Sequence, residues 1–191
     1  MSRLARLSAA FALLFCGAYA LGGESYVALV PWRVVEPDAE VDAPLALYWI
    51  PASADELRRS AMLTSDDLTL FSSQCVAMRV VRLNDIDRIA EFSADAELPV
   101  AVLTNRAGEI VGRVDSEYGV LSVAEVEDLV RDELGRRAAE QDAVLDRARE
   151  RAEADDVDGA VALYRSVWEE RCVCPRQARD AKKALRKLGR R

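Results

Sequence analysis

Residues 98–112 constrain the fold more than any other part of this sequence. Residues 100–103 are apolar and rich in β-branched side chains, as expected of a strand that is buried on both faces. A polar turn ending in Gly108 follows, and Ile110-Val111 resumes the strand pattern. Pro99 lacks an N–H group, so it suits the first residue of a strand or a cis bond at a turn. The segment therefore predicts a β-hairpin that begins at a proline.

Strand and helix patterns alternate in the chain before this hairpin, and a further helix pattern follows it. Ser53 with Glu56, and Ser122 with Glu125, form S-x-x-E capping boxes, each of which predicts the start of a helix. We expect strands at residues 32–35, 44–50 and 76–83, and helices at residues 53–62, around 68–75, at 85–92 and from 123 to 134. The order predicts an α/β fold.

Three features together resemble the thioredoxin-like family. They are the aromatic pair Tyr48-Trp49 that ends a strand, the helix start at Ser53, and Leu98-Pro99 before the hairpin. Ser53 and Pro99 are 46 residues apart, close to the family's spacing between its active-site motif and its proline. The resemblance covers about residues 44–134. It implies a central sheet flanked by helices, with Pro99 in the cis form beside the N-terminus of the first helix, and a substrate groove at Leu98 and Pro99.

The family's redox chemistry is missing from its usual place. Redox members have C-x-x-C where this chain has Ser53-Ala54-Asp55-Glu56. Dithiol exchange needs an attacking thiolate and a second thiol to resolve the mixed disulfide, so this degenerate motif predicts no exchange. Many members also carry a buried acid at the position of Leu47. A serine hydrolase of the usual kind is disfavoured because the chain has no histidine. We interpret Ser53, Asp55 and Glu56 as helix-capping residues.

Three cysteines, Cys75, Cys172 and Cys174, follow the N-terminal region. An odd number leaves at least one thiol unpaired within a monomer, and the sequence does not fix the pairing. A disulfide from one of the later two to Cys75, or inert burial, is the favoured interpretation, because structural disulfides are common in exported proteins. A metal site is disfavoured, because two thiols without histidine leave the coordination incomplete.

The alternative is a displaced redox pair formed by Cys172 and Cys174. Pro175 suits the first position of a helix, which makes Cys174 its N-cap. The helix N-terminus and the neighbouring Arg171 and Arg176 are expected to lower a thiol pKa there. The alternative function is therefore a thiol-disulfide oxidoreductase. It requires the two sulfurs to lie near Pro99.

The N-terminus has the pattern of an export signal. Arg3 and Arg6 precede an apolar stretch at residues 7–21, and Ala18-Tyr19-Ala20 is a small-x-small cleavage site. We predict a signal peptide at residues 1–20 and a periplasmic or extracellular protein. A lipoprotein signal at Cys16 fits less well because bulky Phe15 precedes it, and the run is short for an uncleaved membrane anchor.

Residues 136–191 read as helix throughout and follow a thioredoxin-like unit at residues 25–135. Gly159, Ala160 and Tyr164 are similar to the second helix of a tetratricopeptide repeat, but only one unit is visible, and such repeats need several. We therefore favour a helical extension whose apolar stripes pack on each other or on the sheet. The alternative is a partner-docking module with Tyr164 and Trp168 as anchors.

The charge of the chain is uneven. Residues 171–191 hold nine basic residues and one acidic residue, a net +8, whereas residues 21–170 carry −17. The acidic body disfavours nucleic acid as a partner. The apolar face of the basic tail is small and Ala-rich, so we expect at most weak membrane contact. The sequence therefore favours a binding or scaffolding role toward another protein, and an enzyme is the less favoured class. We expect no cofactor.

Overall fold

The structure is a computed structural model that describes residues 29–36, 41–93 and 97–189. These residues form a five-stranded mixed sheet and six α-helices, so the α/β class predicted from the sequence is confirmed. The predicted signal peptide at residues 1–20 lies outside the described residues.

The sheet has the strand order β1-β3-β2-β4-β5. The central strand, β2, runs parallel to β3 and antiparallel to β4, and all six of its residues are buried because both sheet faces are covered. β4 and β5 form the hairpin predicted from the sequence, joined by a turn in which Gly108 has φ +81°. The bounds are β1 Arg33–Val34, β2 Leu45–Ile50, β3 Val76–Val80, β4 Val100–Asn105 and β5 Ile110–Asp115.

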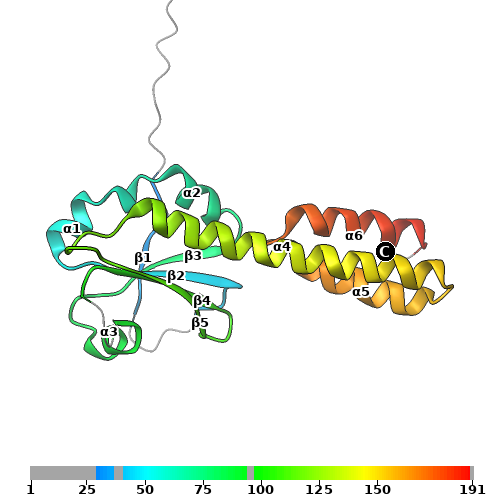
Figure 1. The fold of residues 1–191 in the computed structure, drawn as a ribbon, viewed down its shortest axis with the longest axis horizontal. Coiled ribbons are helices and arrows are strands. Elements are labelled where there is room, and N and C mark those ends of the chain that lie inside the picture. Colours follow the sequence, from blue (N-terminus) through cyan, green and yellow to red (C-terminus); the bar gives the residue numbers. More distant parts are fainter. Residues whose placement is uncertain (1–28, 37–40, 94–96, 190–191) are drawn as a thin grey trace, which may run out of the picture.

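Helices cover the two faces of the sheet unequally (Figure 1). Alternate residues of β2 point to opposite faces. Leu47 and Trp49 pack in one cluster with residues of α2 and α4, whereas Tyr48 packs in a second cluster with Phe92 of α3. The helices are α1 Ala54–Arg59, α2 Asp66–Ser72, α3 Ile86–Ser93, α4 Val123–Glu153, α5 Val157–Glu169 and α6 Pro175–Lys187, with a 3-10 turn at Ala61–Leu63.

Helix α4 runs without a break across residues 135 and 136, where the sequence predicts a boundary between two units. Its first half packs on the sheet through Val126 and Val130, and its second half packs on α5 and α6 through Leu145 and Ala148. Ion pairs of Glu133 with Arg136 and Arg137, three and four residues on, span Gly135 and support the helix there. The sheet unit and the extension therefore share one helix.

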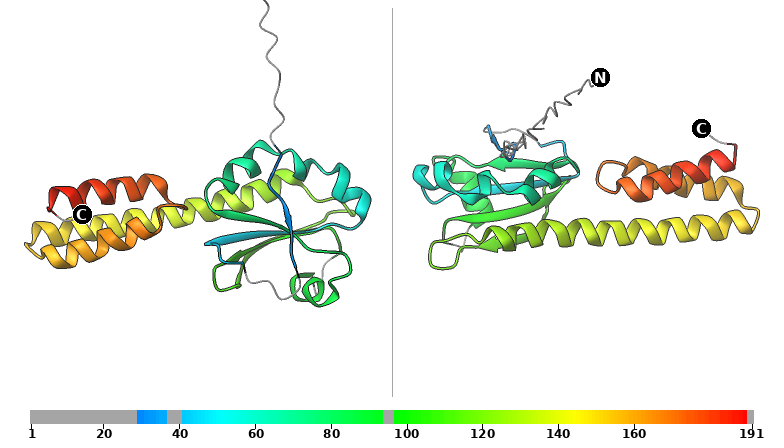
Figure 2. Two further views of the ribbon diagram at one scale, coloured as in Figure 1. Left: turned by 180° about the vertical axis from the view of Figure 1, so that it is seen from behind. Right: turned by 90° about the horizontal axis from the view of Figure 1, so that it is seen from above.

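The second half of α4, α5 and α6 form a helical arm that extends from one side of the sheet (Figure 2). Its core is made by the predicted apolar stripes, which pack on each other: Leu145, Ala148, Ala160, Val161, Tyr164, Val167, Ala181 and Leu185. The basic residues of α6 lie outside this core, and Pro175 occupies the first turn of α6 after the N-cap Cys174, as the sequence predicts.

Candidate functional site

Three chain segments meet at one edge of the sheet, which we call the proline edge. Ile50 pairs with Val100, and Val100 pairs with Asp115, so the register brings together the segments that flank these residues. The proline edge comprises residues 51–53, 97–99 and 116–120. The Leu98–Pro99 peptide bond is cis. The Ser116 hydroxyl donates a hydrogen bond to the Glu97 carbonyl (3.0 Å), which ties two of the segments together.

The degenerate motif caps helix α1. Ser53 Oγ accepts a hydrogen bond from the Glu56 amide (3.1 Å), and Glu56 Oε2 accepts one from the Ala52 amide (2.6 Å). Ala54 is the first helical residue, and Asp55 forms an ion pair with Arg58. These contacts satisfy amides that a helix N-terminus otherwise leaves unpaired. The capping interpretation is confirmed.

The strand that leads into this motif supplies no ionisable group to it. Leu47 is fully buried among apolar side chains of the sheet and of helices α2 and α4. The neighbouring Trp49 is also fully buried and packs against Trp32 at 5.5 Å between ring centroids. The interior behind the proline edge is therefore apolar packing.

Large apolar side chains are exposed around the proline edge. Tyr118 is 94% exposed and Val120 is 69% exposed, in a tight turn closed by two backbone hydrogen bonds between Glu117 and Val120. Ile86, 74% exposed, begins α3 in the chain segment that follows the carboxyl end of β3. None of these three residues was predicted as a site residue from the sequence. For Tyr118 and Val120 the available signal was an aromatic residue and a valine in a short polar segment that has Gly119 at its turn.

The disulfide lies at the opposite edge of the sheet. Cys75 is bonded to Cys172. Cys75 directly precedes β3, whose first residue Val76 pairs with Leu45 at the start of β2. Pro99 lies beyond the other end of β2, which is six residues long, so the two positions are separated by about 17 Å of strand. The bond confirms the favoured pairing with Cys75 and identifies Cys172 as the partner.

The alternative redox pair is not formed, because Cys172 is bonded to Cys75 and Cys174 is a free, buried thiol. The expected lowering of the thiol pKa at Cys174 is also wrong. Burial raises that pKa, and the carboxylate of Glu170 adds to the rise. The two arginines act elsewhere: Arg171 lies over the Trp168 ring, and Arg176 donates a hydrogen bond to Asp142 (3.4 Å).

The two expected partner anchors differ in exposure. Tyr164 is 4% exposed and packs inside the arm, so it is not accessible to a partner. Trp168 is partly exposed and lines a groove between α5 and α6. The sequence pattern places both on an apolar stripe of one helix, but the docking of α6 covers only the first completely.

The described part of the chain holds no group of three or more His, Cys, Asp or Glu residues placed to bind a metal ion. None of its helices combines the length and the apolar character needed to cross a membrane.

Comparison with known protein families gives no match for this sequence, and comparison with curated proteins finds none that is similar to it.

Proposed function

We propose that this chain is a thioredoxin-like protein that has lost dithiol exchange and binds another protein at its proline edge. The strand order, the antiparallel hairpin β4–β5 and the cis bond before Pro99 support the assignment to this class. One observation carries the functional part: Ser53 and Glu56 are engaged in capping α1. Among the described residues, the cysteines lie away from this edge: Cys75 and Cys172 are bonded to each other, and Cys174 is buried.

The exposed side chains at the proline edge support a binding role. Tyr118, Val120 and Ile86 are all more than two-thirds exposed. Tyr118 and Val120 lie on one turn, and neighbouring exposed apolar side chains are typical of a surface that is covered by a partner. We further propose an exported location, periplasmic or extracellular, where the Cys75–Cys172 disulfide is stable.

An insulin-reduction assay with dithiothreitol tests the loss of redox activity. We expect the purified protein to reduce insulin at the background rate, because an attacking thiolate is missing from the proline edge. The matched control is the double variant Ser53→Cys and Glu56→Cys, which restores two thiols at the start of α1 and is expected to raise the rate. Turnover by the unmodified protein that persists when Cys172→Ser and Cys174→Ser are introduced together would overturn the proposal.

Site-specific photocrosslinking in cells tests the binding role. A photoreactive amino acid at Tyr118 is expected to give a discrete protein adduct. The same group at Ile110, which is exposed at the other end of β5, serves as the control and is expected to give none. Equal adducts at both positions, or none at position 118, would contradict binding at the proline edge.

A further inference from the structure

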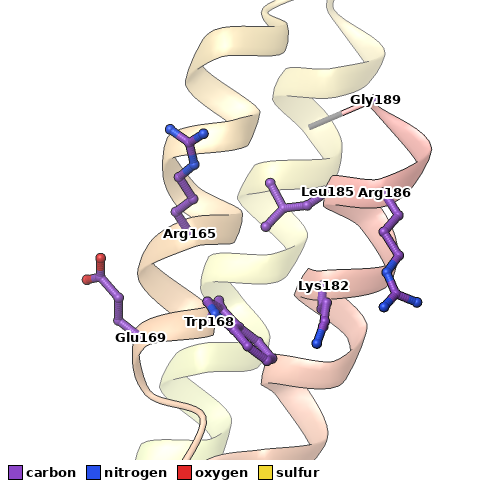
Figure 3. A pocket seen from close by; sticks show the side chains of 7 residues that line it. All are labelled: Arg165, Trp168, Glu169, Lys182, Leu185, Arg186 and Gly189. Atoms are coloured by element: carbon purple, nitrogen blue, oxygen red, sulfur yellow. The ribbon is translucent and has the colours of Figure 1, made fainter. Parts of the chain in front are cut away.

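A basic groove lies between helices α5 and α6, on the arm and away from the proline edge (Figure 3). Its volume is about 1060 Å³. The Trp168 ring and the Leu185 side chain point between the two helices and form its floor. The remaining lining residues are three cations, one carboxylate and a glycine: Arg165, Lys182, Arg186, Glu169 and Gly189.

The cations of this groove differ from most arginines earlier in the chain. Between residues 58 and 151 most arginines form ion pairs with carboxylates, as Arg131 does with Asp67 and Arg113 with Asp115. Arg165, Lys182 and Arg186 form none with any carboxylate of the described residues. The chain has seven more acidic than basic residues. The unpaired positive charge is a property of this part of the arm, which Arg179, Lys183 and Lys187 of α6 share, and the groove is where such charge lies beside an apolar floor.

Trp168 brings an apolar surface to these charges. Lys182 Nζ lies 4.6 Å from its ring centroid, and Arg171 Cζ lies 5.7 Å from it. Both distances fit cation–π contacts, which hold Lys182 in the groove and Arg171 against the same indole without neutralising either charge. A ligand that fits this arrangement has negative charge together with an apolar group that packs on the indole.

We propose that this groove binds an acidic segment of a partner protein, with one apolar side chain of that segment packed against Trp168. Its length suits a short segment: on the α6 side the lining runs from Lys182 to Gly189, about 10 Å along the helix axis, which an extended peptide of about three residues spans. A membrane surface fits less well, because the apolar floor is recessed between two helices and does not protrude into lipid. A nucleic acid carries phosphates along its whole length and would extend from the groove onto the acidic body, where the net charge of −17 on residues 21–170 repels it.

Fluorescence anisotropy with a labelled octapeptide tests this proposal. The probe contains six acidic residues and two leucines, and a second peptide has glycine in place of both leucines. We expect the leucine peptide to bind the full-length protein at 0.15 M salt and the glycine peptide to bind more weakly. The double variant Lys182→Glu and Arg186→Glu is expected to weaken binding by about tenfold or more, because reversed charge repels the probe.

The matched control is Lys183→Glu and Lys187→Glu, which changes the net charge equally on the same helix. These two lysines line a different cleft, beside Asp180 and Tyr164. The control is expected to weaken binding less than threefold. If both double variants weaken binding equally, or if the glycine peptide binds as well as the leucine peptide, general charge attraction explains the binding and the proposed site is wrong.

Two further probes separate the possible ligand classes. Vesicles containing phosphatidylglycerol and a single-stranded oligonucleotide are each offered to the same proteins. If the vesicles or the oligonucleotide bind more tightly than the leucine peptide, and Lys182→Glu with Arg186→Glu abolishes that binding, the proposal of a protein partner is wrong. Melting curves verify that each variant is folded, and the neutral pair Lys182→Gln and Arg186→Gln repeats the test if charge reversal destabilises the arm. The insulin assay probes the other end of the molecule. A failure of the proposed function there is therefore distinguishable from a failure of the proposed peptide groove.

Discussion

The two edges of the sheet are built in opposite ways. At the proline edge the side chains of Ser53 and Glu56 cap the start of α1, and Tyr118 and Val120 remain exposed to solvent. At the other edge, the loop between α5 and α6 is bonded to Cys75 and inserts Val173 and Cys174 into the sheet core. We call this second edge the closed edge. Covalent and apolar contacts fasten the arm there, and the proline edge is left free.

This difference bears on the role of the cysteines. A thiol that serves redox exchange needs a lowered pKa and access to solvent. Cys174 has the reverse properties, because it is 2% exposed and its pKa is raised by burial. The cysteines at the closed edge have the environment of structural residues. The predictions below ask how far the stability of the protein depends on this edge.

The largest effect is expected from removing the disulfide. Cys75 and Cys172 are 97 residues apart. Breaking a bond that closes so long a loop increases the entropy of the unfolded chain, at a cost of about 3–4 kcal/mol. We expect the double variant Cys75→Ala and Cys172→Ala to lose this much free energy of unfolding, measured by urea denaturation.

Reduction of the unmodified protein supplies the control for this prediction. The reductant is expected to lower the stability of the unmodified protein to about that of the double variant, and to leave the double variant unchanged. If the unmodified protein denatures at the same urea concentration with and without reductant, the bond does not fasten the arm and the contrast between the edges is wrong.

A smaller effect is expected from Glu133→Gln. Glu133 is 8% exposed and accepts hydrogen bonds from Arg136 (2.7 Å) and Arg137 (2.7 Å). The hydrogen bond from Arg136 is the largest cause that lowers the pKa of this carboxyl below its usual range. We expect the variant to lose about 1–2 kcal/mol of unfolding free energy at pH 7.

The pH dependence of this loss follows from the direction of the pKa shift. A carboxyl with a lowered folded-state pKa stabilises the protein fully above its unfolded pKa, which is about 4.3. The contribution disappears as the pH falls through the folded-state pKa. The difference between the variant and the unmodified protein is therefore expected to be constant from pH 7 to pH 5 and to shrink below about pH 4.

Glu140→Gln is the matched control. Glu140 also pairs with Arg136, but both side chains are more than half exposed. Exposed ion pairs contribute little, so we expect a loss below about 0.5 kcal/mol. Equal losses for the two variants would show that burial at Glu133 has no special role in joining the arm to the sheet.

Local signals in the sequence predicted most elements correctly. The capping pairs at Ser53 and Ser122 locate two helix starts, and the turn at Gly108 locates the hairpin, because each depends on residues close together in the chain. The strand predicted at residues 76–83 was too long: β3 ends at Val80, and Arg82 beyond it forms an ion pair with Glu36.

Features that depend on the docking of the arm were not predictable in the same way. The partner of Cys172 depends on where the loop between α5 and α6 meets the sheet. The burial of Tyr164 depends on the position of α6, and the pKa of Cys174 depends on the same contacts. The exposure of Tyr118 also follows from tertiary structure, because a single aromatic residue in a turn does not indicate whether a neighbour covers it.

The smallest effect is expected from removing the cap of α1. Ser53 caps a helix that has no buried residue, whereas Ser122 caps α4, whose first turns place Val126 in the core. Losing a serine cap costs about 1 kcal/mol where the helix unfolds together with the protein. We expect Ser122→Ala to lose about that much unfolding free energy. We expect Ser53→Ala to lose less than about 0.5 kcal/mol, because α1 can open by itself.

Hydrogen exchange distinguishes local opening from global unfolding. In Ser53→Ala, the amides of Glu56 and Leu57 are expected to exchange faster, while amides of β2 and β4 keep their protection. The amide of Leu57 is a sensitive reporter because it donates to the Ser53 carbonyl (3.1 Å) in the first turn of α1. If Ser53→Ala lowers protection in β2 as much as Ser122→Ala does, α1 unfolds together with the sheet. The proline edge would then be as firmly built as the closed edge, and its freedom to adapt to a partner would have no structural basis.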